Sequence, residues 1–391
     1  MSFLQTLAAA FKGGAGRVPL ARAFNSPWIF ADAYPARQVF EYSGSVRRAY
    51  LDNPVAQRSV RLVAEGIGQA PLQPADPALV ALVTATSAGQ SLLETLASQL
   101  LLHGNAWVQV IKDGAGRPVE LYALRPERVS AVLGDDGWPV AWTYRVGETT
   151  LTIPVLDDSA SPNVIHIKGF HPSDDHYGAG CLSAADQAVA IHNAASGWNR
   201  ALLENAARPS GALVYDTGAA DGLTAEQFDR LKAELTSAFS GQGNAGRPML
   251  LEGGLKWQSL SLSPADMDFA TLKAAAARDI ALAFGVPPML IGLPGDSTYA
   301  NYREANRALW RLTLLPLAAK LLAALAEGLE TWFPDAGLAV DLDRVPALAE
   351  DRQNLWTQVS AADFLSDAEK RSLLGLPDAS ANSATKLKAK P

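Results

Sequence analysis

Two long helical segments with a compact insert between them constrain this chain more than any other feature. The first is predicted over 183–207, where Ser183 and Asp186 have the spacing of a capping box, and would be about 37 Å long. The second starts at Ser263, which suits an N-cap. Both are rich in alanine, so other helices can approach them closely. Because two such helices make a poor isolated globule, we expect neighbouring copies of the chain to cover their sides.

The insert has the signals of a small α/β unit. A strand is predicted over 212–215, a helix over 224–240, and two more strands over 248–251 and 255–260. The stretch 241–246 fits G-x-G-x-x-G, but a helix precedes it and a strand follows it. This order is the reverse of a dinucleotide site, so we interpret the stretch as a connector.

Helices and then strands are predicted in the N-terminal half. Residues 1–50 show weak periodicity and are expected to form a partly ordered arm. A helix capped by Asp52 or Asn53 follows, and a second helix is predicted over 91–103. The later turns are rich in Gly and Asp, which is typical of hairpins. We predict an antiparallel meander and one further strand, over 106–111, 119–123, 128–133, 140–146 and 164–167.

A third long helix is predicted over 300–327, with Pro316 in its interior. Proline there removes a backbone hydrogen bond, so the helix is expected to bend. A strand is predicted over 338–342, and two shorter helices over 351–359 and 366–374.

Composition limits the classes of function. The chain has 391 residues, 48% of them hydrophobic, which is enough for a sizeable core. Its formal net charge is −7, whereas proteins that grip nucleic acid are usually basic. A tube through which DNA slides is a different case, because strong attraction would stall the DNA. The single cysteine, Cys181, cannot form an internal disulfide and indicates a reducing compartment.

The apolar segments do not indicate a membrane protein. No basic residue precedes the apolar start of the chain, whereas a signal peptide needs one there. The most apolar stretch, 314–326, is too short to cross a bilayer core of about 30 Å as a helix. We therefore expect a soluble protein with no membrane partner.

Candidate enzyme chemistry is sparse. The segment from His171 to His176 holds two histidines and two aspartates, which are metal-ligand types, but its spacing matches no zinc signature and favours a structural loop. His103, His166 and His192 are isolated, and we interpret each as a core or interface residue. No phosphate-binding loop and no G-x-S-x-G elbow is present. The sequence predicts neither catalysis nor a cofactor, while bound metal at the 171–176 loop would revive the enzyme alternative.

Aromatic and basic residues mix between Tyr299 and Arg311. One interpretation is contact with a polyanion. The other is a helix with Tyr302, Leu309 and Leu312 buried and its arginines solvated. The two are evenly balanced for Arg303 and Arg307, whereas Trp310 is assigned to the core.

The order of the segments resembles the portal proteins of tailed phages, specifically the family shared by HK97-like phages and gene transfer agents. Each matching stretch is weak alone, but together they span 50–377 in one order. The strongest reads AAAARDIALAFGVPPMLIG, a helix that runs into Gly-Val-Pro-Pro. The matching stretches are Asn53-Pro54-Val55 with its helix to Pro71-Leu72, Leu102 to Ala106, Leu121 to Pro126 with Val129, Val164 to Ile167, Gly178 to Ala184, Ala274 to Gly292, and Arg352 to Pro377.

This resemblance implies an α+β portal fold with a role for each segment. The wing domain combines antiparallel strands and helices, two stem helices cross the ring, a small α/β clip meets the adaptor, and a short helical crown ends the fold. The implied divisions are an N-terminal arm at 1–50, wing at 51–180, stem helix at 181–207, clip at 208–263, second stem helix at 264–287, tunnel-loop region at 288–299, kinked helix and second part of the wing at 300–345, crown at 346–380, and a basic tail at 381–391.

The resemblance also implies candidate residues. The tunnel loop, at the narrowest part of the channel, has a polar tip without positive charge, and a few basic residues would face the DNA. These channel candidates are Asp296, Ser297, Thr298, Tyr299, Lys273, Arg278 and Arg303. Candidates for adaptor binding in the clip are Phe228, Arg230, Gln242, Asn244 and Arg247.

A portal works as a structure and has no catalytic role. The resemblance implies a ring of twelve subunits at one capsid vertex of a virion or virion-like particle, with double-stranded DNA passing through without sequence specificity. Its implied partners are the terminase large subunit, the head–tail adaptor and the major capsid protein, with ATP hydrolysis left to the terminase. Phage and gene transfer agent fit equally, and another ring scaffold, such as an adaptor or secretion ring, stays open as an alternative.

Overall fold

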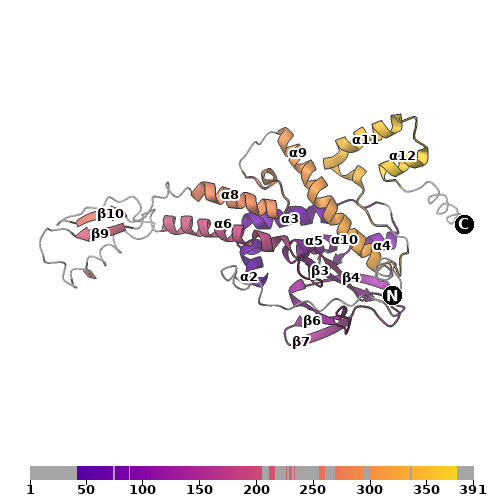
Figure 1. Ribbon diagram of the computed structural model, residues 1–391, viewed down its shortest axis with the longest axis horizontal. Coiled ribbons are helices and arrows are strands. Elements are labelled where there is room, and N and C mark those ends of the chain that lie inside the picture. Colours follow the sequence, from indigo (N-terminus) through magenta and orange to yellow (C-terminus); the bar gives the residue numbers. More distant parts are fainter. Residues whose placement is uncertain are drawn as a thin grey trace, which may run out of the picture.

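Two antiparallel helices form an arm that projects from the body of the molecule (Figure 1). In this computed structural model, α6 (Cys181–Glu204) leads outward and α8 (Phe269–Ala283) returns. At the far end of the arm, β9 (Gly211–Tyr215) pairs antiparallel with β10 (Leu255–Ser259). The structure describes residues 42–73, 75–87, 89–204, 211–215, 226, 229–230, 233, 255–259, 269–293, 299–334 and 337–376.

The start of α6 differs from the prediction. The helix begins at Cys181, and Ser183 lies inside its first turn, where its Oγ donates to the Gly180 carbonyl at 2.8 Å. Asp186 pairs with Arg48 at 3.1 Å, so the predicted capping box is wrong. Ser263 and the strand predicted over 248–251 lie outside the described residues, and those described within 224–240 are helical.

Five helices form the N-terminal part of the body: α2 (Tyr42–Val46), the π-helix η1 (Arg47–Leu51), α3 (Pro54–Gly68), α4 (Pro77–Thr84) and α5 (Leu92–Leu102). Asn53 caps α3, as predicted, by accepting two backbone N–H groups at 3.0 Å each. Ser45 and Ala49 are fully buried. Residues 42–50 therefore belong to the packed body and not to the predicted arm.

The strands form two three-stranded antiparallel sheets. The first has the order β4 (Pro118–Leu124), β3 (Asn105–Lys112), β8 (Val164–Lys168), and the second has the order β5 (Val129–Leu133), β6 (Pro139–Val146), β7 (Thr149–Pro154). The prediction of one meander is wrong, because the 3₁₀ turn η2 (Pro126–Arg128) separates β4 from β5. A short pair, β1 (Thr86–Ser87) with β2 (Gln90–Ser91), precedes α5.

The third long helix changes its winding before Pro316. It consists of α9 (Tyr299–Leu309), the π-helix η5 (Trp310–Leu314) and α10 (Leu315–Gly328). The Leu315 N–H bonds to the Trp310 carbonyl, five residues back. Because Pro316 has no N–H, the chain takes this wider turn and the helix continues. The predicted bend stays a prediction.

This helix is also long and apolar enough, by length and composition, to span a membrane. Among the described residues it alone passes that test, over Ala300–Gly328. We expected the apolar stretch 314–326 to be too short to cross a bilayer, but the helix that contains it is 29 residues long, so that expectation was wrong about length. Leu321, Leu322 and Leu325 nevertheless pack in the core of the body, as in the core helix of a globular domain.

The C-terminal segment contains helices and no strand at 338–342, where Val340 forms an isolated bridge with Leu72. Ser366 and Glu369 form a complete capping box at the start of the last helix. The elements here are η6 (Leu342–Arg344), η7 (Pro346–Leu348), α11 (Ala349–Ala361) and α12 (Asp367–Leu374), while the short helix η4 (Pro288–Ile291) lies between α8 and α9.

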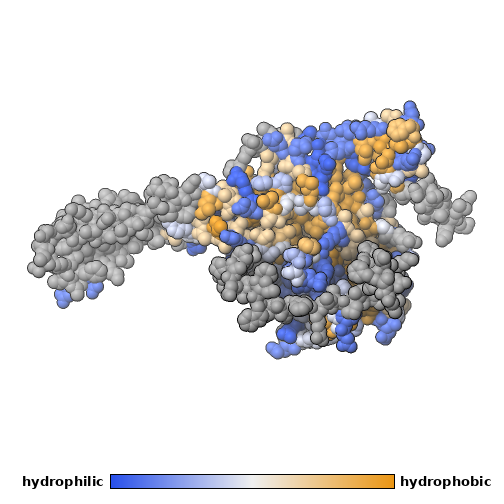
Figure 2. Space-filling view, viewed as in Figure 1, coloured by the Kyte–Doolittle hydropathy of each residue, from blue (hydrophilic) through white to orange (hydrophobic). Residues whose placement is uncertain are grey.

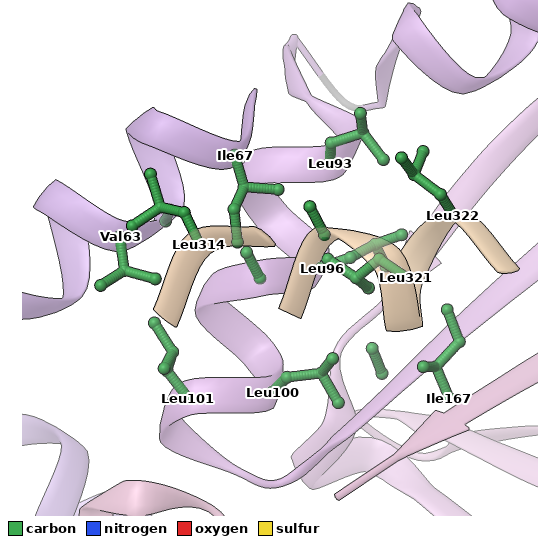
Figure 3. Close-up of a cluster of buried hydrophobic side chains, with 14 of the residues drawn as sticks. Val63, Ile67, Leu93, Leu96, Leu100, Leu101, Ile167, Leu314, Leu321 and Leu322 are labelled. Carbon is green, nitrogen blue, oxygen red and sulfur yellow. The ribbon is translucent and has the colours of Figure 1, made fainter. Parts of the chain in front are cut away.

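The main core joins α3, α5 and the third long helix over the first sheet. Leucines from these helices interdigitate, and Ile167 of β8 closes the cluster (Figure 3). Burying a leucine side chain fully stabilises the folded state by about 1.5–3 kcal/mol. Since α3 contacts α8 and α5 contacts α6, this cluster holds the helices on which the base of the arm rests. A second cluster lies between the two sheets and contains Trp107, Leu124, Val129, Trp142, Ile153 and Val164.

Candidate functional site

The outward face of α6 carries an exposed heptad stripe, here named the α6 seam. Its residues follow one another at spacings of 3, 4, 3, 4 and 3, and Ile191 and Trp198 are each 37% exposed. Leu182, Ala185 and Val189 lie on the other face of the helix and are buried. The α6 seam comprises Ala184, Gln187, Ile191, Ala194, Trp198 and Ala201.

A matching stripe lies on α8, here named the α8 seam. It comprises Leu272, Ala275, Asp279 and Leu282, at spacings of 3, 4 and 3. Leu282 is 77% exposed and Leu272 is 45% exposed. The opposite face of α8 is buried and packs against α6 and α3. Figure 2 shows hydrophobic colouring where these two helices leave the body.

Both seams have the spacing by which helices pack knobs into holes. Each stripe is mostly apolar, apart from Gln187 and Asp279, and its residues are exposed in the described part of the chain. Large exposed apolar patches mark interaction sites. The alanines allow close approach, while Ile191, Trp198 and the two leucines supply apolar area. The arm thus exposes two different stripes with the spacing of helix packing.

The interpretation of 299–311 is partly corrected. Leu309 is buried and Trp310 packs against the main core, as predicted. One of the two interpretations predicted that Tyr302 and Leu312 are buried, but they are 51% and 77% exposed. The Thr313 hydroxyl donates to the Gly285 carbonyl at 2.6 Å, so the exposed Leu312 lies on an element tied to the end of α8.

The arginines of α9 form an ion-pair cluster with α11. The guanidinium groups of Arg303 and Arg307 lie 3.2 and 3.0 Å from the same oxygen of Glu350. Arg307 also pairs with Glu304 at 3.1 Å and with Asp351 at 3.4 Å, and its side chain is only 19% exposed. These contacts give Arg307 a structural role, while Arg303, at 53%, keeps half of its side chain in solvent.

The other channel candidates are spread over separate elements. Tyr299 begins α9, whereas Asp296, Ser297 and Thr298 lie outside the described residues. Lys273 and Arg278 lie on α8, and an Arg278 nitrogen donates to the Ala274 carbonyl at 3.4 Å. The described basic candidates thus lie on two separate helices, Lys273 and Arg278 on α8 and Arg303 on α9.

The clip candidates are largely beyond the described residues. Arg230 is exposed and helical. The other four, which are Phe228, Gln242, Asn244 and Arg247, lie outside the described part of the chain, as does the 241–246 connector.

The isolated histidines pack as structural residues, as predicted. His166 stacks on Trp107 at 4.5 Å with ring planes 2° apart, and its Nε2 is 3.0 Å from Asn105 Oδ1. Burial, aided by the charge of Lys168, lowers the pKa of His166 to about 3. His192 is 4% exposed and lies 3.1 Å from Asn53 Nδ2. Burial and then the charge of Lys273 lower its pKa.

The 171–176 loop is held by its own side chains. Asp174 accepts the N–H groups of His176 and Tyr177 at 2.8 and 2.9 Å, and His171 Nδ1 accepts the Ser173 N–H. In the part of the chain that the structure describes, no group of three or more His, Cys, Asp or Glu side chains is placed to hold a metal ion. These contacts are those of a structural loop.

Sequence reasoning missed the two seams, although their signal was available. It identified 183–207 and 264–287 as helices and noted their alanine, but did not write out the heptad spacing of the outward residues. Which heptad stripe faces the body becomes clear only after α6 and α8 are paired.

Comparison with known proteins identifies the family. The family model for phage portal proteins matches residues 54–375. The chain belongs to the phage portal protein family. A protein of Rickettsia bellii is 40% identical over 347 residues, covering 84% of this chain and 88% of its own length.

Solved structures agree with this assignment. A chain from the neck of a native gene transfer agent particle, determined with C12 symmetry, is 48% identical, with a TM-score of 0.66 over 88% of this chain and 96% of its own. An HK97-family portal protein from Corynebacterium diphtheriae shares the fold, with a TM-score of 0.56 at 19% identity over 76% of this chain and 96% of its own. The α+β class and the resemblance to HK97-like portals are confirmed.

Proposed function

We propose that this portal protein forms a closed ring at one capsid vertex of a gene transfer agent or similar virion-like particle. Double-stranded DNA passes through the ring during packaging and exit. Family membership supports the proposal, as does the 48% identity to a neck protein from a gene transfer agent particle solved with C12 symmetry. By analogy with that neck, the ring has twelve subunits.

The two seams on the arm are the observation that carries the ring. Each copy offers an α6 seam and an α8 seam, which are different surfaces on the outward faces of a helix pair. Packing the α6 seam of one copy on the α8 seam of the next makes a head-to-tail contact, which closes into a ring when the rotation allows. The exposed side chains of Ile191, Leu272 and Leu282 are then covered.

The roles of the remaining segments follow from this arrangement. The arm helices serve as the stem (181–207 and 264–287), and the strand pair β9–β10 belongs to the clip (208–263), where the head–tail adaptor docks. The sheets and helices of 51–180, with 300–345, form the wing, and α11 with α12 forms a crown at 346–380.

The protein acts as a conduit and docking platform and has no catalytic role. The terminase large subunit docks on the ring and supplies ATP hydrolysis, and the major capsid protein surrounds it. The loop 288–299 lines the narrowest point with Asp296, Ser297, Thr298 and Tyr299. Lys273, Arg278 and Arg303 make the few positive contacts with DNA, and the net charge of −7 keeps the DNA from binding tightly.

Electron microscopy of the purified protein tests the ring directly. Class averages viewed down the axis are expected to show about twelve subunits around a central hole. The hole should be wide enough for a DNA duplex, which is about 20 Å across. Closed dimers would contradict the proposal and favour the enzyme alternative. If the purified protein forms only monomers, the imaging is repeated with the head–tail adaptor present. Monomers under that condition would also contradict the proposed ring.

A matched pair of leucine variants tests the seams. Leu282→Asp places a charge in the α8 seam, where assembly would bury it unpaired, so ring formation should fall at least tenfold. Leu151→Asp on β7 is the control, because Leu151 is 50% exposed and lies outside both seams. The sedimentation velocity of both variants gives the ring fraction. Equal ring fractions in the two variants would refute the seam contact.

A further inference from the structure

Two hollows meet at the point where the described chain begins. The first, of about 640 Å³, is lined by five residues of α5, more than any other helix or strand supplies, and is named the α5 hollow. The second, of about 700 Å³, is bounded by Gly178 and Gly180 and is named the glycine hollow. Tyr42, Pro126 and Glu127 line both. Since Tyr42 is the first described residue, the chain that precedes it starts at the rim of both hollows.

The polar groups of the glycine hollow are satisfied within the body. Asn105 Oδ1 accepts the Gly178 N–H at 2.7 Å and lies 3.0 Å from His166 Nε2. Asn105 Nδ2 donates to the Gly178 carbonyl at 3.0 Å. This hollow therefore presents no buried group that calls for a further partner.

The α5 hollow differs in one buried atom. Gln99 uses its Nε2 to bond the Leu124 carbonyl at 2.9 Å, while its Oε1 is buried and has no hydrogen-bond partner in the described structure. An unpaired buried acceptor costs about 1–3 kcal/mol, so a donor that reaches this oxygen would stabilise whatever docks there. A backbone N–H is the donor that any chain segment can supply.

The charge and length of the preceding chain fit this hollow. Glu94 and Glu127 line it, together with Arg125. Residues 1–41 contain four basic and two acidic side chains, and Arg37 lies five positions before Tyr42. Eight extended residues reach at most about 29 Å, which is ample to cross the hollow. Tyr34 precedes Pro35, which favours an extended backbone there.

We infer that residues 34–41 dock in the α5 hollow of their own chain, with a backbone N–H bonded to Gln99 Oε1 and Arg37 paired with Glu94 or Glu127. Docking within the same chain follows from continuity, because Tyr42 already lines the hollow. The segment then ties η2, at the boundary of the two sheets, to α5 in the helical core. The inference does not depend on the ring.

Disulfide trapping in the full-length chain tests the inference. Ser98 lines the α5 hollow, and Ser98→Cys changes only one atom. It is combined with Val39→Cys or Gln38→Cys, because adjacent residues of an extended segment point to opposite sides. Cys181→Ser removes the native thiol. The control replaces Ser98→Cys with Ala323→Cys, which is exposed on α10 and lines neither hollow.

The expected result is an intrachain disulfide to position 98, seen by mass spectrometry, at least tenfold more abundant than in the control. Disulfide-linked dimers in place of the intrachain bond would overturn docking within the chain and assign the hollow to a neighbour's segment. Equal trapping in both backgrounds, or none, would overturn docking altogether.

Trypsin cleavage of the otherwise unaltered protein gives an independent reading. Docking should slow cleavage after Arg37 at least tenfold relative to cleavage after Arg17, and Gln99→Leu, which removes the acceptor, should restore it. Equal rates after Arg37 and Arg17 would contradict the inference.

Discussion

At the residue scale, the aromatic cluster between the sheets depends on a histidine that stays neutral. Trp107 and Trp142 surround His166, at ring distances of 4.5 and 4.8 Å. Burial holds its pKa at about 3, against an ordinary value of 6.5. Below pH 6.5 the unfolded chain takes up a proton that the folded chain refuses. The stability that this histidine contributes is thus complete above pH 6.5 and is lost as the pH falls toward 3.

Replacing this histidine should flatten the pH dependence of folding. Between pH 7 and pH 5 the wild-type protein should lose about 2 kcal/mol more than His166→Gln, because each proton contributes about 1.4 kcal/mol per pH unit. Glutamine cannot titrate, and its amide can still donate to Asn105 Oδ1. Urea unfolding of both proteins at the two pH values measures the difference. Parallel pH profiles would show that His166 titrates normally in the folded state.

At the element scale, the first long helix of the body is fixed at its N-terminus by one buried side chain. Asn53 is 1% exposed, caps α3 through Oδ1, and donates through Nδ2 to Asn193 Oδ1 at 2.8 Å. The same Nδ2 lies 3.1 Å from His192. One residue therefore ties α3 to α6 and holds the base of the arm.

Removing this cap should cost more than removing an ordinary one. Asn53→Ala should lower the free energy of unfolding by about 2–3 kcal/mol, since it deletes a cap and leaves buried partners unpaired. Ser91→Ala is the control, because Ser91 caps α5 through a single hydrogen bond of 3.5 Å, and about 1 kcal/mol is expected. Chemical denaturation measures both losses. If the two variants lose the same free energy of unfolding, the hydrogen bonds from Asn53 to α6 add nothing to stability.

Elements defined by local signals could be predicted from the sequence, whereas their pairing could not. The cap at Asn53, the helix starts near 91 and 366, and the strands flanked by Gly and Asp turns lie close to their predicted positions. β7 was missed because Thr149–Pro154 is largely polar and exposed. The second sheet was missed because β3 pairs with β8, about sixty positions further along, and no local pattern encodes that pairing. The π-helix before Pro316 was expected only as a bend.

At the scale of the whole molecule, a conduit has to surround DNA without holding it. The chain is acidic, and Arg303 and Arg307 on α9 are partly neutralised by Glu350 of α11. Each phosphate contact releases counterions and strengthens binding, so a few contacts spread around a ring suffice to guide the duplex. On this proposal, the contacts come from Lys273, Arg278 and Arg303.

Charge reversal at these three positions should reduce the DNA content of particles without preventing ring assembly. The variants are Lys273→Glu, Arg278→Glu and Arg303→Glu, and Arg145→Glu, exposed on β6, is the control. Packaged DNA per particle is measured after nuclease treatment, and electron microscopy confirms the rings. A severalfold loss is expected in at least one lumen variant and none in the control, because only a charge that faces DNA meets its phosphates. If all four variants package normally, these residues do not face the lumen. Loss in the control as well would mean that the reversed charge acts on assembly and not on the passage of DNA.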